Sequence, residues 1–330
     1  MARIVLGLGS SHSPMLNMGA EDWPGYEAIE RSGRIPLYDR QGRPAAFDAL
    51  VATADPRMAD TIAPAERARR HDLTEAAIAR LGTVLDSAAL DALIVVGDDQ
   101  KEMFDENNQP AVAIYHGETI RNAPFVAEPG RLPFIVRAYQ RNCETSGTRE
   151  YPVHAALARH LVDTLIEREV DVATAKSLPR DMGEGHAFGF VHKRVMTGRV
   201  VPIVPVIFNT FYPPNQPTPR RCYRLGQEIA AAVASFPGEA RVGIMASGGL
   251  SHFVIDEELD QIVIAALREK DAATLQSLPR QRLEAGSSEI RNWICVAGAV
   301  EHLALDWIEY VPCYRTLAGT GTAMGFASWC

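Results

Sequence analysis

Three short apolar, β-branched segments of the 330-residue chain each lead into a cluster of polar residues that could bind metals or move protons. The clusters are Gly9-Ser-Ser-His-Ser-Pro14 after residues 4–8, Gly97-Asp-Asp-Gln-Lys-Glu102 after residues 92–96, and Ser247-Gly-Gly-Leu-Ser-His252 after residues 242–246. In α/β sheets the active-site crevice lies beyond the carboxyl ends of the strands, so distant clusters can converge there. We therefore predict one site built from all three clusters.

The side chains suited to this chemistry are two histidines, His12 and His252, at matching positions in their clusters. A single histidine after a strand is more often structural, but two matching clusters favour a functional site. His186 lies in a glycine-rich stretch, Glu184-Gly-His-Ala-Phe-Gly-Phe190, and could approach a substrate. Glu289 begins an expected helix, where an acidic residue also favours the helix dipole.

Other known catalytic or cofactor-binding motifs are incomplete or absent in the sequence. Gly7-Leu-Gly9 begins like a dinucleotide fingerprint, but His12 stands where the third glycine would be. The Ser247-Gly-Gly sequence is not a G-x-S-x-G nucleophile elbow, and the chain contains no H-E-x-x-H motif.

The elements that must position these residues alternate between strand-like and helix-like segments. Expected strands are residues 4–8, 92–96, 111–115, 171–175, 200–208 and 242–246, and expected helices are 74–85, 154–166, 222–234, 256–270 and 288–304, the first with a possible start at Pro64. This alternation predicts an α/β fold, a single domain whose mixed or largely parallel sheet is flanked by helices.

For two segments we make more specific structural predictions. Residues 17–66 are rich in Gly, Pro, Asp and Arg, and we expect a long excursion with one or two short helices that serves as a binding loop or lid. Pro202 and Pro205 suggest that one side of the strand at 200–208 lies near a sheet edge.

Composition narrows the class of protein. The net charge of −8 and the scattered arginines argue against a nucleic-acid surface, and the group Arg67, Arg69 and Arg70 reads as a solvated helix face. The five cysteines are far apart and never in CxxC spacing, which argues against a disulfide framework or a thiolate zinc site. Without a signal peptide or a membrane-spanning segment in the sequence, we expect a cytoplasmic protein.

Several of these motifs together resemble the class III extradiol ring-cleavage dioxygenases. The shared stretches are Gly9-Ser-Ser-His-Ser-Pro14, Ser247-Gly-Gly-Leu-Ser-His252, Tyr212-Pro-Pro with Arg220-Arg-Cys-Tyr-Arg-Leu-Gly226, and Glu284-Ala-Gly-Ser-Ser-Glu-Ile-Arg-Asn-Trp293. The type most similar is the catalytic β subunit of protocatechuate 4,5-dioxygenase, with the gallate and 3-O-methylgallate dioxygenases. The resemblance covers nearly the whole chain, with an insertion at about residues 17–70.

The resemblance implies an Fe(II) site of the 2-His-1-carboxylate type with open positions for a diol and O₂. It assigns His12 and Glu289 as metal ligands, His252 as the acid–base residue, and His186 as a second pocket histidine. Gln100 stands where the family has its second histidine ligand. Three interpretations stay open: Gln100 binds the metal through its amide oxygen; another residue, His71, Asp98 or Asp99, replaces it; or the chain has lost dioxygenase activity.

The implied reaction is ring cleavage of a catechol-type aromatic acid such as protocatechuate, gallate or a methylgallate, with His252 taking a phenolic proton. The expected partners are this small aromatic diol and O₂, with neither nucleic acid nor membrane, in a homo-oligomer. A small partner subunit is possible, and the insertion could replace one. Two alternatives remain: a metal-dependent hydrolase or lyase acting on a ring or carbonyl compound, and a non-catalytic binding protein on the same fold.

Overall fold

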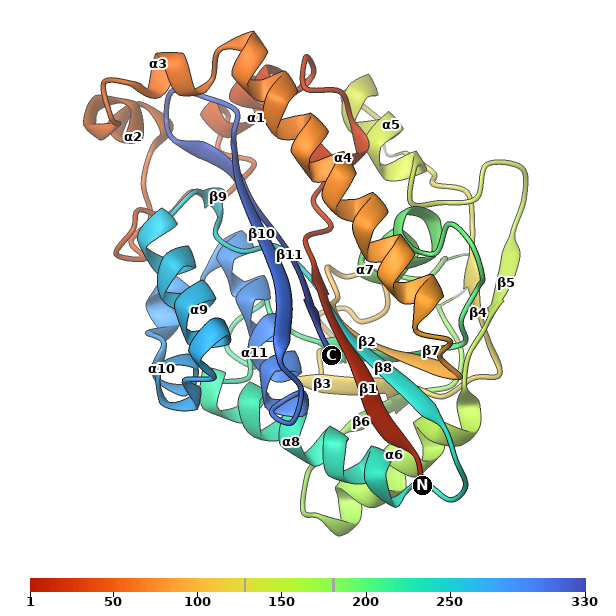
Figure 1. Cartoon of the computed structure of the whole chain (residues 1–330). Helices are drawn as coiled ribbons and strands as arrows, with labels where there is room; N and C mark the ends of the chain where they lie inside the picture. Colours follow the sequence, from red (N-terminus) through yellow and green to blue (C-terminus); the bar gives the residue numbers. More distant parts are fainter. Residues whose placement is uncertain (128, 180–181) are drawn as a thin grey trace.

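A computed structural model describes residues 1–127, 129–179 and 182–330 of the chain, and its largest feature is a nine-stranded mixed sheet (Figure 1). The strand order is β10-β11-β1-β8-β2-β7-β3-β6, with β9 paired to β11, and β4 and β5 form a separate pair. The strands are β1 (Arg3–Ser10), β2 (Ala92–Asp98), β3 (Val112–Tyr115), β4 (Thr119–Asn122), β5 (Arg149–Pro152), β6 (Ala173–Ala175), β7 (Ile203–Phe208), β8 (Arg241–Ser247), β9 (His252–Val254), β10 (Leu305–Tyr314) and β11 (Thr320–Trp329).

The centre of the sheet is parallel. Strands β1, β8, β2 and β7 are neighbours with parallel registers, so their carboxyl ends lie at one edge of the sheet. Strand β3 joins β7 antiparallel, and on the other side β11 and β10 add an antiparallel hairpin to β1. The predicted fold class, a single α/β domain with a mixed sheet flanked by helices, is confirmed.

Helices cover both faces of the sheet. They are α1 (Tyr26–Arg31), α2 (Phe47–Thr53), α3 (Met58–Thr61), α4 (Pro64–Ser87), α5 (Pro133–Gln140), α6 (Ala155–Glu167), α7 (His186–Phe190), α8 (Pro219–Ser235), α9 (Glu257–Glu269), α10 (Ala272–Ser277) and α11 (Ile290–Ala299). The predicted helices correspond to α4, α6, α8, α9 and α11, and α4 does begin at Pro64. The hairpin of β10 and β11 and the short strands β4, β5 and β9 were not predicted.

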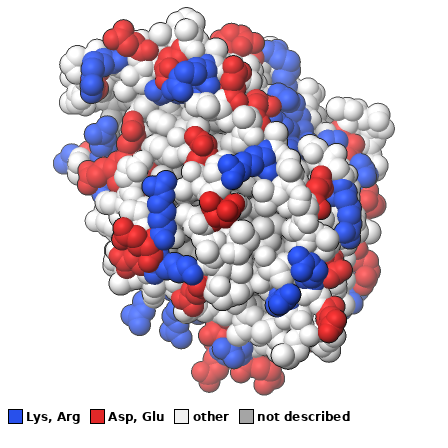
Figure 2. All heavy atoms as spheres, viewed as in Figure 1, with Lys and Arg blue, Asp and Glu red and all other residues white. Residues whose placement is uncertain are grey.

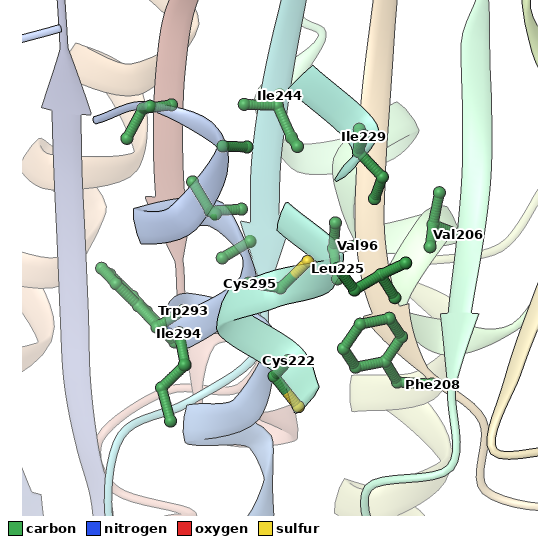
Figure 3. Packing of buried hydrophobic residues seen from close by; sticks show 14 of the residues in the cluster. Val96, Val206, Phe208, Cys222, Leu225, Ile229, Ile244, Trp293, Ile294 and Cys295 are labelled. Atoms are coloured by element: carbon green, nitrogen blue, oxygen red, sulfur yellow. The ribbon is translucent and has the colours of Figure 1, made fainter. Parts of the chain in front are cut away.

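Alternate residues of the central strands enter two different cores. Ile94 and Val96 pack with α6, α8, α9 and α11, whereas Leu93 and Val95 pack with α4, α5 and α7 on the other face. Figure 3 shows the first core, where side chains of α8 and α11 lie over those of β2, β7 and β8. The two helices approach closely at Gly226, because any side chain there would overlap the backbone carbonyl of Cys295.

The expectation that one side of the strand at 200–208 lies near an edge is wrong, because β7 has neighbours on both sides. The carbonyl of Ile203 and the N–H of Asn209 both point away from β2. Because backbone groups alternate in direction along a strand, the backbone nitrogen of Pro205 also points away from β2. The ladder with β3 ends at Val206. The missing N–H of Pro205 therefore removes no ladder hydrogen bond.

The expected excursion contains α1, α2 and α3 and is fixed to the rest of the protein by a buried ion pair. Glu30 of α1 accepts a 2.7 Å hydrogen bond from Nε of Arg315, just beyond β10, and another of 2.7 Å from the Thr320 hydroxyl. Glu30 and Arg315 are each 2 % exposed. The first part of the excursion is thus held firmly against the end of the sheet.

We expect Glu30→Ala to lower the free energy of unfolding by about 3–5 kcal/mol, because it leaves the Arg315 charge buried without its partner. Urea unfolding followed by circular dichroism measures this. The control is Glu27→Ala on the same helix, which removes a solvent-exposed pair with Arg31 and should cost less than about 1 kcal/mol. Equal effects of the two changes would contradict a structural role for the buried pair.

The surface carries both signs of charge. On the face in Figure 2, Lys and Arg side chains are interspersed with Asp and Glu, and no large single-sign patch is visible. None of the helices in the described part of the chain is long and apolar enough to cross a membrane.

Candidate metal centre and active site

The three polar clusters meet at the carboxyl edge of the parallel strands. His12 follows β1, Asp98 ends β2, Ser247 ends β8, and the chain returns to the same place at His252, the first residue of β9. A cavity of about 630 Å³ opens there. Its lining includes every residue predicted for the site, namely His12, Gln100, His186, His252 and Glu289.

The hydrogen bonds of His12 decide which ring nitrogen is free. Its Nδ1 lies 3.0 Å from the hydroxyl of Ser247, and that hydroxyl donates its proton to the carbonyl of Ala187 at 2.7 Å. Ser247 must therefore accept a proton from Nδ1 of His12, since a carbonyl can only accept. The Nε2 lone pair is left free, and it lies 3.3 Å from Oε2 of Glu289 and 3.5 Å from Oδ1 of Asp98.

His186 is oriented in the same way by a carboxylate. Glu102 accepts hydrogen bonds from the backbone N–H and from Nδ1 of His186, at 2.9 and 2.8 Å. Nε2 of His186 then lies 3.2 Å from Nε2 of His12 and 3.7 Å from Oδ2 of Asp98. Burial acts to lower the pKa of His186, but the charge and hydrogen bond of Glu102, together with the charges of Asp98 and Glu289, outweigh it and raise the pKa to about 10.

Two buried carboxylates complete the cluster. Burial and the charge of Glu289 raise the pKa of Asp98 above its ordinary value, and Oδ1 of Asp98 has no hydrogen-bond partner. Glu289, at the start of α11, accepts a 2.5 Å hydrogen bond from the backbone N–H of Gly249. Burial acts to raise the pKa of Glu289, but the imidazoles of His252 and His12 hold it well below its usual range.

This arrangement fits a divalent metal ion. One atom from each of His12, Asp98 and His186 lies within 4.8 Å of the other two. The second ring nitrogen of each histidine is held by a hydroxyl or a carboxylate, as is usual for metal-binding histidines. Nε2 of His12 and Nε2 of His186 lie 3.2 Å apart beside the unpartnered Oδ1 of Asp98, and a cation that replaces the proton between the two rings would satisfy all three groups. Imidazole and carboxylate are ligands suited to Fe(II) and Zn(II).

His252 presents one nitrogen to the same place. Its Nδ1 donates to the backbone carbonyl of Leu250 at 2.8 Å, so Nε2 is the nitrogen available for proton exchange, 3.2 Å from Oε1 of Glu289. Burial acts to lower the pKa of His252, but Glu289 raises it above the ordinary value. The ring lies against Gly286, where a side chain would overlap the imidazole, so glycine is required there.

Gln100 lies beside the cluster, and the three residues considered in its place differ in their contacts. Its side-chain nitrogen lies 3.4 Å from Oδ2 of Asp98, so Gln100 contacts the cluster through a carboxylate. Asp99 accepts hydrogen bonds from the backbone N–H groups of residues 102, 103 and 104, which uses both its oxygens in the turn. His71 lies on α4 beside the indole of Trp23, with ring centroids 6.3 Å apart, and does not line the cavity. Among the three substitutes considered for Gln100, Asp98 alone joins the cluster.

Sequence reasoning missed the residues that orient the histidines. Glu102 is part of the polar cluster after β2 but received no role, and its partner His186 is 84 positions away. Ser247 begins the third cluster, and its partner His12 is 235 positions away. For Glu102 and Ser247, the only signal in the sequence was that each lies at or just after the end of a strand.

Comparison with known proteins gives a family match and several relatives, two of which are described below. The sequence profile of the catalytic LigB subunit of aromatic ring-opening dioxygenase matches residues 111–325, well over half of the chain. A gallate dioxygenase from Pseudomonas putida (strain KT2440) is 36% identical over 107 residues, which are 32% of this chain and 30% of that protein. A 2,3-dihydroxyphenylpropionate/2,3-dihydroxicinnamic acid 1,2-dioxygenase from Burkholderia vietnamiensis (strain G4) is 35% identical over 103 residues, 31% of this chain and 30% of that protein. The alignments thus span less than a third of either relative.

Proposed function

Because the chain belongs to the family of the catalytic LigB subunit of aromatic ring-opening dioxygenase, we propose that it cleaves a catechol-type aromatic acid with O₂ and uses Fe(II). The observation that carries the proposal is that Asp98 and Glu289 each place a carboxylate oxygen within 3.5 Å of Nε2 of His12, and that Oδ1 of Asp98 has no hydrogen-bond partner. The names of both relatives describe dioxygenases acting on aromatic compounds. The predicted homo-oligomer and small partner subunit stay predictions.

The metal ligands that we propose are His12, Glu289 and Asp98. The first two were predicted from the resemblance, and Asp98 takes the place for which Gln100 was the first choice. His186, whose Nε2 faces the same point, is proposed to contact substrate or oxygen. When bound, Fe(II) supplies the redox chemistry that joins the diol and O₂.

The chain's own residues bind the substrate and move its protons. We propose that Nε2 of His252 accepts a proton from a hydroxyl group of the diol and later returns it; the hydrogen bond from Nδ1 to the Leu250 carbonyl, which leaves Nε2 available, supports this role. Imidazole suits this role, since its ordinary pKa lies near neutral pH. Apolar and aromatic side chains line the cavity above the ligands and can hold an aromatic ring and exclude water. They include Pro14, Tyr26, Ile29, Ile35, Leu132, Ile135, Tyr139 and Phe253.

The direct test is anaerobic reconstitution with Fe(II), followed by oxygen uptake with catechol, protocatechuate, gallate and 3-O-methylgallate. We expect one O₂ consumed for each acidic diol, together with loss of the aromatic absorbance. Turnover with zinc in the absence of O₂ would instead favour the hydrolase alternative. Failure of the protein to bind Fe(II) at all would favour a non-catalytic binding protein.

The choice between Asp98 and Gln100 gives a separate prediction. We expect Asp98→Ala to weaken Fe(II) binding by more than about 100-fold, because a ligand is lost. Gln100→Ala should weaken it by about tenfold, a typical effect of losing a residue that only contacts a ligand. Anaerobic competition with a chromophoric chelator measures both affinities. A larger effect of Gln100→Ala than of Asp98→Ala would make Gln100 the ligand.

A further inference from the structure

The lining of the cavity carries more positive than negative side chains. Three arginines line the cavity, Arg34, Arg131 and Arg315, whereas Glu289 is its single carboxylate among the described lining residues. Glu289 lies at the ligand cluster, so the other described lining residues include no carboxylate. A ligand bound in this cavity therefore meets arginine side chains as well as the histidines.

Arg315 is the buried arginine of this lining, and its charge is compensated by Glu30. Its Nη2 lies 2.7 Å from Oε1 of Glu30 but lacks the geometry of a hydrogen bond, and this buried atom has no other partner. The guanidinium lies over the ring of Tyr26, 4.0 Å from its centroid, and 5.9 Å from the centroid of Phe253. Phe253 follows His252 in the chain, and both residues line the same cavity as Arg315.

Arg34 supplies the positive charge that is available to a ligand in the cavity. Arg315 is neutralised by Glu30, and Arg131 lies over the rings of Phe125 and Tyr139. Arg34, three residues after α1, is exposed and forms no ion pair or hydrogen bond with any residue that the structure describes. An arginine that lines a cavity without a partner is available to a ligand, and its planar fork matches a carboxylate.

We propose that Arg34 binds the carboxylate of the aromatic substrate and selects acidic diols over neutral ones. The inference rests on the proposed function, and it gives the excursion a role in substrate choice. The Glu30–Arg315 pair holds α1, and with it the start of the segment leading to Arg34, at the cavity mouth. The diol end of the ring then faces His252 and the ligand cluster.

The test compares two ligands of nearly equal shape, 3,4-dihydroxybenzoate and the uncharged 3,4-dihydroxybenzamide. Anaerobic calorimetry on the Fe(II)-reconstituted protein measures their dissociation constants. Arg34→Ala should weaken binding of the benzoate by about 10- to 100-fold, the usual range for one charge-assisted contact. It should change binding of the benzamide by less than about twofold. Arg34→Lys should lie between wild type and Arg34→Ala, because it keeps the charge but loses the fork.

Two control variants complete the design. Arg315→Lys keeps a cation beside Glu30 and leaves Arg34 in place, so the ratio of the two dissociation constants should stay near that of wild type. Arg57→Ala removes an exposed arginine of the excursion that is paired with Asp55 and should change neither constant. Equal losses for the two ligands, or no loss in Arg34→Ala, would overturn the proposal.

The outcome is separable from that of the proposed function. If the wild-type protein binds the benzoate more tightly than the benzamide but consumes no O₂, the selectivity proposal stands and the dioxygenase proposal fails. If it cleaves both ligands with equal kcat/KM, the dioxygenase proposal stands and the selectivity proposal fails.

Discussion

Glu289→Ala is expected to remove both bound Fe(II) and oxygen uptake. The side chain of Glu289 is buried, and its Oε2 lies 3.3 Å from Nε2 of His12. The alanine variant would leave a gap beside that nitrogen. His12→Ala should have the same effect, since it removes the imidazole that contacts every other group of the cluster. Loss of one ligand from a three-ligand site leaves too few donors for tight binding. We expect iron content below about a tenth of wild type, measured by plasma emission after anaerobic desalting.

The matched control is His160→Ala. His160 is a partly buried histidine on α6 that hydrogen-bonds the backbone carbonyl of Ala232, on the far side of the sheet from α4 and α7. This variant should keep full iron content and oxygen uptake. Circular dichroism spectra that match wild type would show that the ligand variants are folded. Near-normal iron in folded Glu289→Ala or His12→Ala would remove that residue from the metal site.

The sequence predicted the central strands and most long helices, but the C-terminal hairpin was missed for a physical reason. Strand β11 lies between β10 and β1 and is buried along its whole length, so it shows no alternation of apolar and polar residues. It is also rich in Gly, Ala and Thr, of which Gly and Ala are not favoured in strands. Gly325, for example, packs against Leu250 with no room for a side chain. Such a strand is recognisable only from its neighbours.

The sequence predicts which residues come together where strand ends decide their position, but not where side-chain direction decides it. His12 and His252 were expected to lie close together because polar residues after parallel strands share an edge, and both line the cavity. Asp98, Asp99 and Gln100 are consecutive, and which of them faces the cluster depends on the local turn. That turn includes Lys101 in a left-handed conformation, with φ of 65°. Asp98 ends the strand and faces His12, whereas Asp99 turns back to the backbone, a difference that residue type alone does not encode.

The second large effect is expected at His252, where the metal should stay and the reaction should slow. We expect His252→Ala to keep near-normal iron but to lose about 10²- to 10⁴-fold in kcat, the usual contribution of a positioned acid–base group. The reason is geometric: Nδ1 donates to the Leu250 carbonyl, and Nε2 is directed toward Oε1 of Glu289 at the cavity floor. Oxygen uptake at saturating diol, with iron content measured on the same samples, gives the comparison.

His252→Asn separates proton transfer from hydrogen bonding. Asparagine keeps a polar side chain of smaller size in the slot beside Gly286, but it does not titrate near neutral pH. If proton exchange is the role of His252, the asparagine variant should be nearly as slow as the alanine variant. Activity close to wild type in His252→Asn would reduce the role to a hydrogen bond. Loss of iron in both variants would make His252 a metal ligand, because Nε2 lies within 3.2 Å of the Glu289 carboxylate that we assign to the ion.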